Sequence, residues 1–381
     1  MIRTTRLIHI LTLSTVIGFL FVAQGGAIET TAKHAIVVDY DTGNVLLAKN
    51  ADDRVGPASM TKMMTAYLVF ERLRDGRLSL EDTLPVSEKA WRKGGSKMYV
   101  EVGKRVKVED LIRGIIVQSG NDASIVVAEA LDGTEDAFAI EMTEKAIALG
   151  MTGTSFQNSS GWPDSDHYTT VRDLATLAMA TIRDFPDYYH YYAEKEFTFS
   201  KIRQGNRNPL LYKNIGADGL KTGHTEESGF GIAASALRDG RRVIVVAHGM
   251  GSMKERSAQT ERLLGWAFRE WGQYALFESG ETVTDLPVWL GRADTVPVFI
   301  RDSLLVAVPR KSRRQMAVRV VHPEAIPAPV AKGDEIARLV VSAPGMEDVS
   351  VPLFAGAAVG ERNFFGRLGT AIGQLVWGLA E

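Results

Sequence analysis

Cysteine is absent from the sequence, so disulfide bonds and thiolate metal sites are excluded, and the compartment is left open. No charge sign dominates either: 44 Lys and Arg residues stand against 46 Asp and Glu residues, and a formal net charge of -2 gives no case for nucleic-acid binding. The seven histidines show no spacing typical of metal ligands, so we expect neither a metal nor another cofactor. At 381 residues the chain is nevertheless long enough for two domains.

The N-terminus has the pattern of an export signal. A basic start is followed by an uncharged stretch at 7–22 and then by small residues. We expect this signal over residues 1–27, with cleavage after Gly25 or Ala27. Retention as a membrane span is disfavoured, because the stretch contains a histidine and several hydroxyl groups and is short for a bilayer crossing. The mature protein would begin near Ile28, outside the cytoplasm.

A buried helix is predicted around the apolar run 63–70, which is opened by residues 57–62 and closed before Gly76. Ser59 and Lys62 lie three residues apart, so they share one face near the positive end of the helix dipole. Burial disfavours the ammonium form of a lysine, so a neutral amine could take the proton of the neighbouring serine. On this motif alone, the alternative is that Ser59 caps the helix and Lys62 extends to water.

The order of the remaining elements predicts the fold class. A hairpin is expected at 35–48, helices in the middle of the chain, strands at 230–236 and 242–247, and a helix at 253–277. This order predicts an α+β domain over residues 28–279, in which distant parts of the chain complete one antiparallel sheet flanked by helices.

Beyond residue 280 the sequence consists of short strands separated by proline and glycine, which predicts a small all-β domain over residues 280–356. This segment has no polar cluster that suggests chemistry, so we interpret it as a spacer or docking domain.

Residues 357–381 are predicted to form a hinge followed by an amphipathic helix that lies in the plane of a membrane and anchors the protein there. The alternative is that this helix packs on the all-β domain. At about 100° per residue its apolar face collects Phe364, Phe365, Leu368, Ile372, Leu375, Val376 and Leu379.

Three short motifs occur in order along the chain, namely Ser59-x-x-Lys62, Ser119-x-Asn121 and Lys221-Thr222-Gly223. Alone, the second motif could merely cap a helix through Asn121 or Asp122. Together, the three correspond to the set found in class A β-lactamases and penicillin-binding proteins. The ordered set therefore favours catalysis over the structural alternatives.

Each motif has a chemical task in such a site. Ser59 is the expected nucleophile and Lys62 its base, while Ser119 can relay a proton to the leaving amine. Asn121 can hold the substrate amide and orient the lysine amine.

The third motif is expected to bind the substrate. Lys221 offers a positive charge that binds a carboxylate and helps to keep the first lysine neutral, and Thr222 adds a hydroxyl donor. Gly223 lets a substrate backbone approach the strand edge. The backbone N–H groups of Ser59 and of the residue near His224 are expected to form an oxyanion hole.

From about Ala32 to its C-terminus the sequence resembles the low-molecular-mass penicillin-binding proteins that are serine-type D-alanyl-D-alanine carboxypeptidases. Besides the motifs, three segments are similar in sequence to that family, namely residues 118–123, 194–199 and 219–225. The resemblance implies a β-lactamase/transpeptidase-like fold and removal of the terminal D-alanine from peptidoglycan stem pentapeptides through an acyl-enzyme.

The resemblance also implies acylation by β-lactam inhibitors, a role in limiting cell-wall crosslinking and a place on the periplasmic face of the bacterial inner membrane. It assigns Arg207 and Thr225 to the carboxylate site beside Lys221, although Arg207 could equally be a surface turn residue.

Two departures and three rival functions accompany this interpretation. The middle motif is Ser-Gly-Asn, which points to the carboxypeptidase branch, and Ser160 stands where some relatives carry a histidine.

A β-lactamase is disfavoured because no E-x-x-L-N follows the loop at 158–166. A DD-endopeptidase would use the same residues in a cleft of different shape. A non-enzymatic penicillin-recognising scaffold is disfavoured by the intact motifs.

Overall fold

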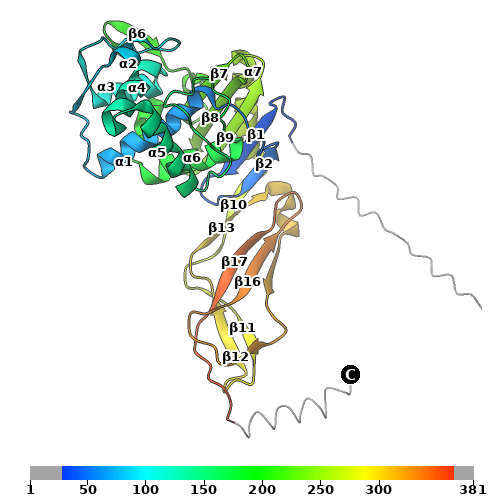
Figure 1. Ribbon diagram of the computed structural model, residues 1–381. Coiled ribbons are helices and arrows are strands. Elements are labelled where there is room, and N and C mark those ends of the chain that lie inside the picture. Colours follow the sequence, from blue (N-terminus) through cyan, green and yellow to red (C-terminus); the bar gives the residue numbers. More distant parts are fainter. Residues whose placement is uncertain (1–27, 364–381) are drawn as a thin grey trace, which may run out of the picture.

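The computed structural model describes residues 28–363, so the predicted export signal and the predicted helix at 364–381 lie outside the described residues. Figure 1 shows two parts: a domain of sheet and helices, and an elongated β module that extends away from it.

The first part is built on a five-stranded antiparallel sheet of order β2-β1-β9-β8-β7. Its strands are β1 (His34–Asp39), β2 (Val45–Lys49), β7 (Ala217–Thr225), β8 (Gly229–Arg238) and β9 (Arg241–Met250). The first hairpin thus pairs with a strand that lies some 200 residues further along, at His34 opposite His248. The expectation that distant parts of the chain complete one sheet is confirmed.

Alternation along the strands explains why both faces of this sheet are covered. On β1, Ile36 and Val38 contribute to a core with the helices of the middle of the chain, while Ala35 and Val37 contribute to a second core. Successive side chains of a strand point to opposite faces, so a strand that is apolar throughout needs a layer on each side.

Helices supply both layers. The first core holds side chains of α1 (Lys62–Arg74), α3 (Val108–Ile116), α4 (Asn121–Asp132), α5 (Glu135–Ala148) and α6 (Val171–Asp184), and the second those of α7 (Met253–Glu270). Figure 1 shows most of the first group gathered beside the sheet. Smaller elements are α2 (Glu88–Arg92), the hairpins β3 (Thr83–Pro85) with β4 (Arg105–Lys107) and β5 (Glu196–Phe199) with β6 (Ile202–Gly205), and the 3-10 turns η1 (Ala58–Thr61), η2 (Tyr189–Ala193) and η3 (Pro209–Tyr212).

The helix predicted over residues 253–277 is too long. Helix α7 ends at Glu270, and Trp271–Phe277 forms strand β10, which pairs with β13 (Leu304–Pro309) of the β module. The aromatic residues of this segment fit a strand as well as a helix, and cross-strand pairing decides between them. The first strand of the β module therefore lies before the domain boundary expected at residue 279.

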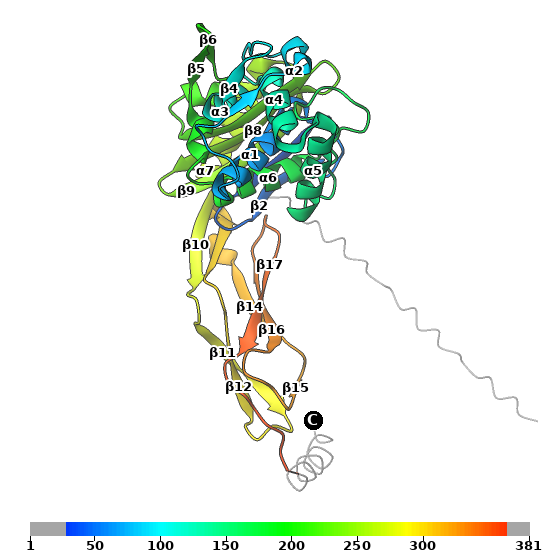
Figure 2. The same ribbon diagram turned by 60° about the vertical axis from the view of Figure 1, so that its left-hand side comes forward.

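The β module also contains a six-stranded sheet of order β14-β16-β17-β12-β11-β15. Figure 2 shows these strands running along the length of the module. Its strands are β11 (Thr282–Trp289), β12 (Thr295–Phe299), β14 (Ala317–Val321), β15 (Ile326–Pro327), β16 (Glu335–Ser342) and β17 (Val349–Ala355), and η4 (Arg310–Gln315) follows β13. The predicted all-β domain is confirmed.

The hinge expected after this domain is instead bonded to it. Backbone hydrogen bonds join Gly356 N–H to Pro297 O at 2.8 Å and Val359 N–H to Val330 O at 2.9 Å. Backbone pairing of this kind restrains the chain irrespective of its glycine content.

Polar contacts join the two parts around Asp39, which is fully buried. Its carboxylate accepts from Arg241 Nε at 2.7 Å and from Gln273 Nε2 at 2.8 Å. Arg241 Nη1 also donates to Trp271 O at 2.7 Å. The arginine thus links β9 to the start of β10, and the glutamine of β10 reaches back to β1.

Candidate active site

The nucleophile candidate lies at a tight turn. Pro57 precedes η1, which holds half-buried Ser59, and α1 begins only at Lys62. The first turn of the predicted helix is therefore of the tighter 3-10 type. The end of the helix is as expected, because Gly76 follows the last turn with a φ of 70°.

Lys62 is fully buried and has three polar neighbours. Its Nζ lies 3.1 Å from Ser59 Oγ, 2.8 Å from Asn121 Oδ1 and 2.6 Å from Ser160 O. The last two atoms can only accept, whereas the hydroxyl can also donate. A neutral amine donates two hydrogens and accepts one, so these partners match a neutral amine that accepts the Ser59 proton.

Burial lowers the pKa of Lys62 from 10.5 to about 7, and the Arg207 guanidinium is the next largest cause. The sequence analysis assigned this electrostatic role to Lys221. A lysine amine with a pKa near neutrality is matched to general-base chemistry at that pH.

The middle motif contacts both buried lysines, Lys221 through Ser119 and Lys62 through Asn121. Ser119 adopts a left-handed conformation with a φ of 58°, and its Oγ accepts from Lys221 Nζ at 2.9 Å. Asn121 opens α4, but its Nδ2 donates to Gly94 O at 2.9 Å while its Oδ1 faces Lys62. The structure therefore favours the cleft over the capping alternative, since the asparagine side chain bonds outside its own helix.

Asp122 organises the loop on the helical side of the cleft, a role that the sequence analysis missed. Its carboxylate accepts from the backbone N–H groups of Met98 and Tyr99, both at 2.9 Å. In the same loop Gly95 lies so close to Asn121 that a Cβ would come within 2.8 Å of Nδ2. The Gly-Gly-Ser sequence signals a loop, but nothing in it signals proximity to the motifs.

Positive charge gathers beside Lys221 with no compensating carboxylate. Burial and nearby cations lower the pKa of Lys221 well below its usual value. Arg207 donates to Ser96 Oγ, and Arg256, which is 5% exposed, donates to Arg207 O and lies over the Phe230 ring. Within residues 28–363, none of the three cations forms an ion pair with a carboxylate. Such a cluster would gain from a bound anion.

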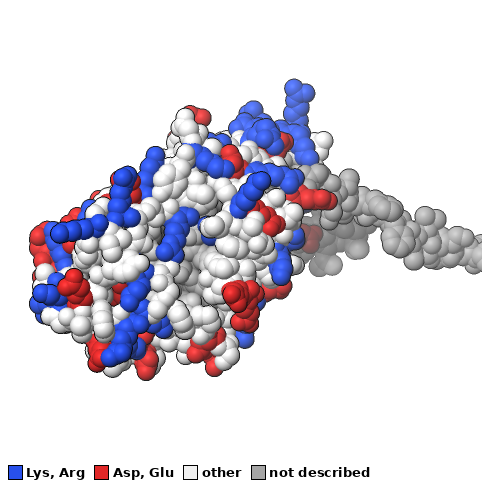
Figure 3. Space-filling model, turned by 90° about the horizontal axis from the view of Figure 1, so that it is seen from above, with Lys and Arg blue, Asp and Glu red and all other residues white. Residues whose placement is uncertain are grey.

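Figure 3 shows Lys and Arg side chains, with few Asp and Glu beside them, in the shallow hollow across the middle of the face seen from above. The sequence analysis named Lys221 and Arg207 but missed Arg256, which lies on a helix and carries no motif.

Packing within the protein explains why position 223 requires a glycine. A Cβ there would lie 2.8 Å from Pro57 O and 3.2 Å from Ala58 Cβ, so the glycine lets β7 pack against η1. The approach of a substrate backbone to the strand edge at this glycine stays a prediction. Thr222, its neighbour, is buried beside Lys221 on the edge strand of the sheet.

The last residues of β7 make contacts with β8 and with the turn between the two strands. The exposed His224 ring stacks on Phe230 with centroids 3.9 Å apart, so only its backbone remains available for an oxyanion hole. Thr225 Oγ1 accepts from Ser228 N–H at 3.0 Å, which fixes the turn into β8. The hydroxyl of Thr225 can still donate, so its part in binding the carboxylate stays a prediction.

The loop that contains Ser160 packs against the nucleophile turn and contacts Lys62. Asn158 Oδ1 accepts from the N–H groups of Gly161 and Trp162, at 2.8 and 2.9 Å. Gly161 lies so close to the nucleophile turn that a Cβ would come within 1.7 Å of Ala58 O. The polar residues, glycine and proline at 158–163 signal a loop. The bond from Lys62 to Ser160 O could not be predicted, because any residue can supply a backbone carbonyl.

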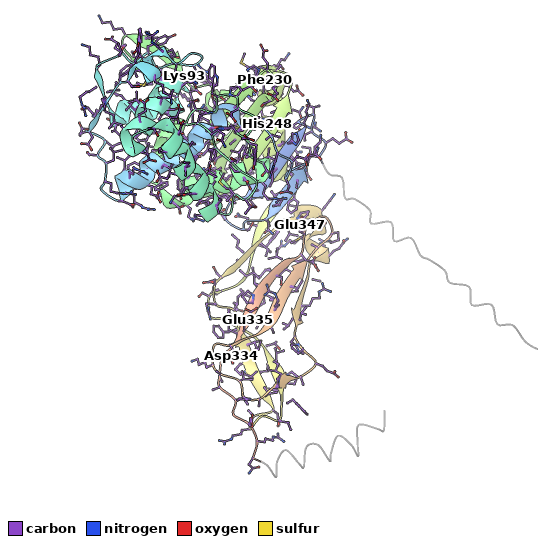
Figure 4. The ribbon with its side chains drawn as sticks, in the orientation of Figure 1. Lys93, Phe230, His248, Asp334, Glu335 and Glu347 are labelled. Atoms are coloured by element: carbon purple, nitrogen blue, oxygen red, sulfur yellow. The ribbon has the colours of Figure 1, made fainter. Side chains whose placement is uncertain are left out.

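A lysine on one rim bridges to this loop. Lys93 Nζ lies 4.1 Å from the centre of the Trp162 ring, a cation–π contact. Figure 4 places Lys93 on the helical side of the domain and Phe230 and His248 on the sheet side. Among residues 28–363, no group of three His, Asp or Glu side chains is arranged to hold a metal ion.

A serine at a helix start, a buried lysine of lowered pKa one turn on, a second serine bonded to another buried lysine and an adjacent edge strand define the class of penicillin-recognising serine enzymes. The chain matches the D-alanyl-D-alanine carboxypeptidase family, peptidase S11, over residues 22–252, and the C-terminal domain of penicillin-binding protein 5 over residues 271–361. It belongs to this carboxypeptidase family.

Individual relatives agree over nearly the whole chain. D-alanyl-D-alanine carboxypeptidase DacA of Escherichia coli is 36% identical over 351 residues, which is 90% of this chain and 87% of that protein. Penicillin-binding protein 5 from Haemophilus influenzae is similar in structure, with a TM-score of 0.80, 35% identity and coverage of 88% of this chain and 99% of that one. Penicillin-binding protein D2 from Listeria monocytogenes, solved in its ampicillin-bound form, covers 64% of this chain and all of its own, with 30% identity and a TM-score of 0.59.

Proposed function

We propose that this protein is a serine D-alanyl-D-alanine carboxypeptidase that removes the terminal D-alanine of peptidoglycan stem peptides. The observation that carries the proposal is the set of contacts at Lys62, whose amine reaches Ser59, Asn121 and Ser160 at once. This arrangement joins nucleophile, base and substrate-orienting amide in one hydrogen-bonded group.

Acylation follows from these positions. Ser59 Oγ attacks the carbonyl carbon of the penultimate D-alanine while Lys62 accepts the hydroxyl proton. Backbone N–H groups of Ser59 and of the residue near His224 stabilise the oxyanion. The proton then passes through Ser119 to the leaving amine, the C–N bond breaks, and free D-alanine departs.

Hydrolysis restores the enzyme. A water molecule attacks the ester carbon of the acyl-enzyme, Lys62 accepts one of its protons, and the C–O bond to Ser59 breaks as the serine regains a proton. Ser160 supplies only its backbone carbonyl to Lys62, so the lysine is the base that the structure offers for this step.

Substrate recognition depends on the terminal carboxylate. Lys221 and Arg207 supply positive charge and Thr222 a hydroxyl donor, and the unpaired cations would be compensated when the carboxylate binds. A site for a carboxylate beside Lys221 and Arg207 favours peptides whose C-terminus lies there. This preference supports exopeptidase action.

The test is release of D-alanine from a diacyl-D-Ala-D-Ala peptide by the mature protein, with Ser59→Ala as the inactive control. Intact mass after exposure to penicillin, followed in time, measures acylation and its reversal. Cleavage of crosslinked peptide dimers with no release of terminal D-alanine would instead identify an endopeptidase, and acylation without peptide turnover a scaffold.

For localisation, we propose that the protein is exported and held at the periplasmic face of the inner membrane by residues 363–381. The uncharged N-terminal stretch and the apolar face of the C-terminal segment support this proposal. In the described part of the chain, no helix has the length and apolar character needed to cross a bilayer.

A further inference from the structure

A buried carboxylate, that of Glu135, lies in the helical layer and takes no part in the reaction steps given above. Glu135 is the first residue of α5 and is 5% exposed. Its Oε1 accepts from Ser159 Oγ at 2.8 Å and from Ser159 N–H at 3.2 Å, and its Oε2 pairs with Lys89 Nζ of α2 at 2.9 Å. Burying an ionised group is costly unless partners compensate it, so Glu135 needs these contacts and they fix its place.

The partner of this carboxylate, Ser159, precedes the residue whose carbonyl contacts the catalytic base. Ser159 O accepts from Thr65 Oγ1 of α1 at 2.6 Å, and Ser160 O accepts from Lys62 Nζ at 2.6 Å. Ser159 is therefore bonded to the start of α5 on one side and to α1 on the other. Bonds on both sides of this residue restrain the direction of the carbonyl that follows it.

The direction of Ser160 O decides how the amine of Lys62 is oriented. A neutral amine has two hydrogens and one lone pair. When the hydrogens are donated to Ser160 O and Asn121 Oδ1, the lone pair is left for the hydroxyl of Ser59. A loop that moved away from Lys62 would release one hydrogen and let the lone pair turn from the nucleophile.

A role in helix stability does not account for the contacts of Glu135. An acidic residue in the first turn of a helix interacts favourably with the helix dipole from an exposed position. Asp136, the next residue of the same turn, is exposed and can serve that purpose. Glu135 instead is buried and bonds to Ser159, which lies 24 residues further along the chain.

The carboxylate of Glu135 is ionised at neutral pH. Burial would raise its pKa, but hydrogen bonds from Lys89 and Ser159 outweigh burial and hold the pKa below its ordinary value. Lys93 also faces this carboxylate, which favours the charged form of that lysine. Glu135 thus brings a fixed negative charge to the helical side of the site.

Charged groups from several elements face Lys62. Burial is the largest cause of its lowered pKa, nearby cations lower the pKa further, and nearby carboxylates raise it. The cations are Arg207 and Lys93, and the carboxylates are Asp122 and Glu135. Lys221 is a further buried cation near Lys62, whereas burial lowers the pKa of His167 to about 4 and leaves that ring neutral at pH 7.

We propose that Glu135 is a positioning residue for the catalytic base: its carboxylate holds Ser159 so that Ser160 O orients the amine of Lys62 during acylation and hydrolysis. Glu135 itself does not reach the substrate. The inference rests on the proposed function, because it takes Lys62 as the base of both steps.

Three variants of the full-length mature protein separate the bonds of Glu135 from its charge. Glu135→Gln keeps an oxygen that can accept from Ser159 but removes the charge, and Ser159→Ala removes the hydroxyl donor but keeps the charge. Asp136→Asn, at the adjacent exposed carboxylate, is the matched control. The measurements are the acylation rate with benzylpenicillin as a function of pH and the rate at which the acyl group is lost, followed by intact mass. Thermal unfolding checks that each variant is folded at the assay temperature.

We expect Glu135→Gln to move the midpoint of the acylation profile to lower pH, because a carboxylate that favours the ammonium form of Lys62 is lost. A shift of about half a pH unit is expected, smaller than the roughly 1–3 units that a charge in direct contact produces. Ser159→Ala should lower both acylation and hydrolysis about tenfold across the pH range, as for a misplaced reacting group. Asp136→Asn should match the wild type.

A structural role alone would lower the unfolding temperature of Glu135→Gln and leave its midpoint in place. Equal pH profiles for Glu135→Gln and Asp136→Asn would therefore overturn the inference. Wild-type rates in Ser159→Ala would overturn it independently, even if Glu135→Gln failed to fold. Failure of the wild-type protein to release D-alanine from a diacyl-D-Ala-D-Ala peptide would instead contradict the proposed function itself.

Discussion

At the scale of single residues, acylation should be confined to Ser59. Among the serines of residues 28–363, it alone combines a helix-start position with a lysine amine 3.1 Å from its hydroxyl. Peptide mapping of the penicillin adduct should therefore find one modified residue. Ser119 is the instructive control, because it too contacts a lysine, and an adduct on it would reverse the assignment of the nucleophile.

The two buried lysines should differ in function. Lys62→Ala removes the base and should lower the acylation rate by about 10²–10⁴-fold. Lys221→Ala removes a cation that recognises the carboxylate and should cost about 1.5–3 kcal/mol, mainly as a higher KM. Stopped-flow acylation and steady-state peptide kinetics separate the two effects. Mild and equal losses in both variants would contradict these roles.

Acylation should depend on pH through Lys62. Its pKa of about 7 means that the reactive neutral amine is lost as the pH falls, so the rate should rise up to about pH 7 and level off above. Arg207 lowers this pKa, so Arg207→Gln should move the midpoint to higher pH, whereas Arg203→Gln, at an exposed arginine paired with Glu196, should not. An unchanged midpoint in Arg207→Gln would disprove the electrostatic role of that residue.

The same shift has a consequence for stability. Between about pH 7 and 10.5 the unfolded chain binds more protons at this lysine than the folded protein does, so this group makes the free energy of unfolding rise with pH across that window.

Single residues also mark the limit of prediction from sequence. Ser59, Lys62, Ser119 and Lys221 could be recognised because chemistry requires those residue types at fixed spacing. The Ser160 carbonyl could not, since its role belongs to the backbone and any residue there could supply it. Arg256 was missed for a related reason: only packing brings this helical arginine to Phe230.

At the scale of elements, the nucleophile turn depends on close backbone contacts with its neighbours. Gly161→Ala places a Cβ 1.7 Å from Ala58 O, whereas Gly150→Ala, with a similar φ of 85°, meets open space. Both variants strain a left-handed backbone, so their difference isolates the clash, for which we expect about 1–3 kcal/mol. Thermal unfolding and the penicillin acylation rate measure it. Equal losses in the two variants would show that the contact is not rigid.

Elements were predictable where periodicity was clear and ambiguous where it was not. The apolar strands around Ile36 and Ile244 and the helices of the middle of the chain are fixed by local patterns. The segment 271–277 and the glycine-rich residues 356–360 are not, because their state depends on pairing with strands elsewhere in the β module.

At the scale of the whole molecule, membrane attachment should depend on the C-terminal segment alone. We expect the mature protein to sediment with membranes and to become soluble when residues 363–381 are removed. Glycines in this segment each lower helix propensity by about 1 kcal/mol, so the helix should need lipid to form. Fractionation at low salt without detergent is the measurement. A full-length protein that is already soluble under those conditions would exclude the anchor.

The β module extends from the domain of sheet and helices to the C-terminal end of the described chain (Figure 2). Its strand β16, with eight residues at about 3.3 Å each, is roughly 26 Å long. The polar contacts of Asp39, Arg241 and Gln273 join the catalytic domain to strand β10 of the β module. If the far end of the module is attached to a surface, the module keeps Ser59 at a minimum distance from the point of attachment. The enzyme would then act on substrate that lies away from that surface rather than directly on it.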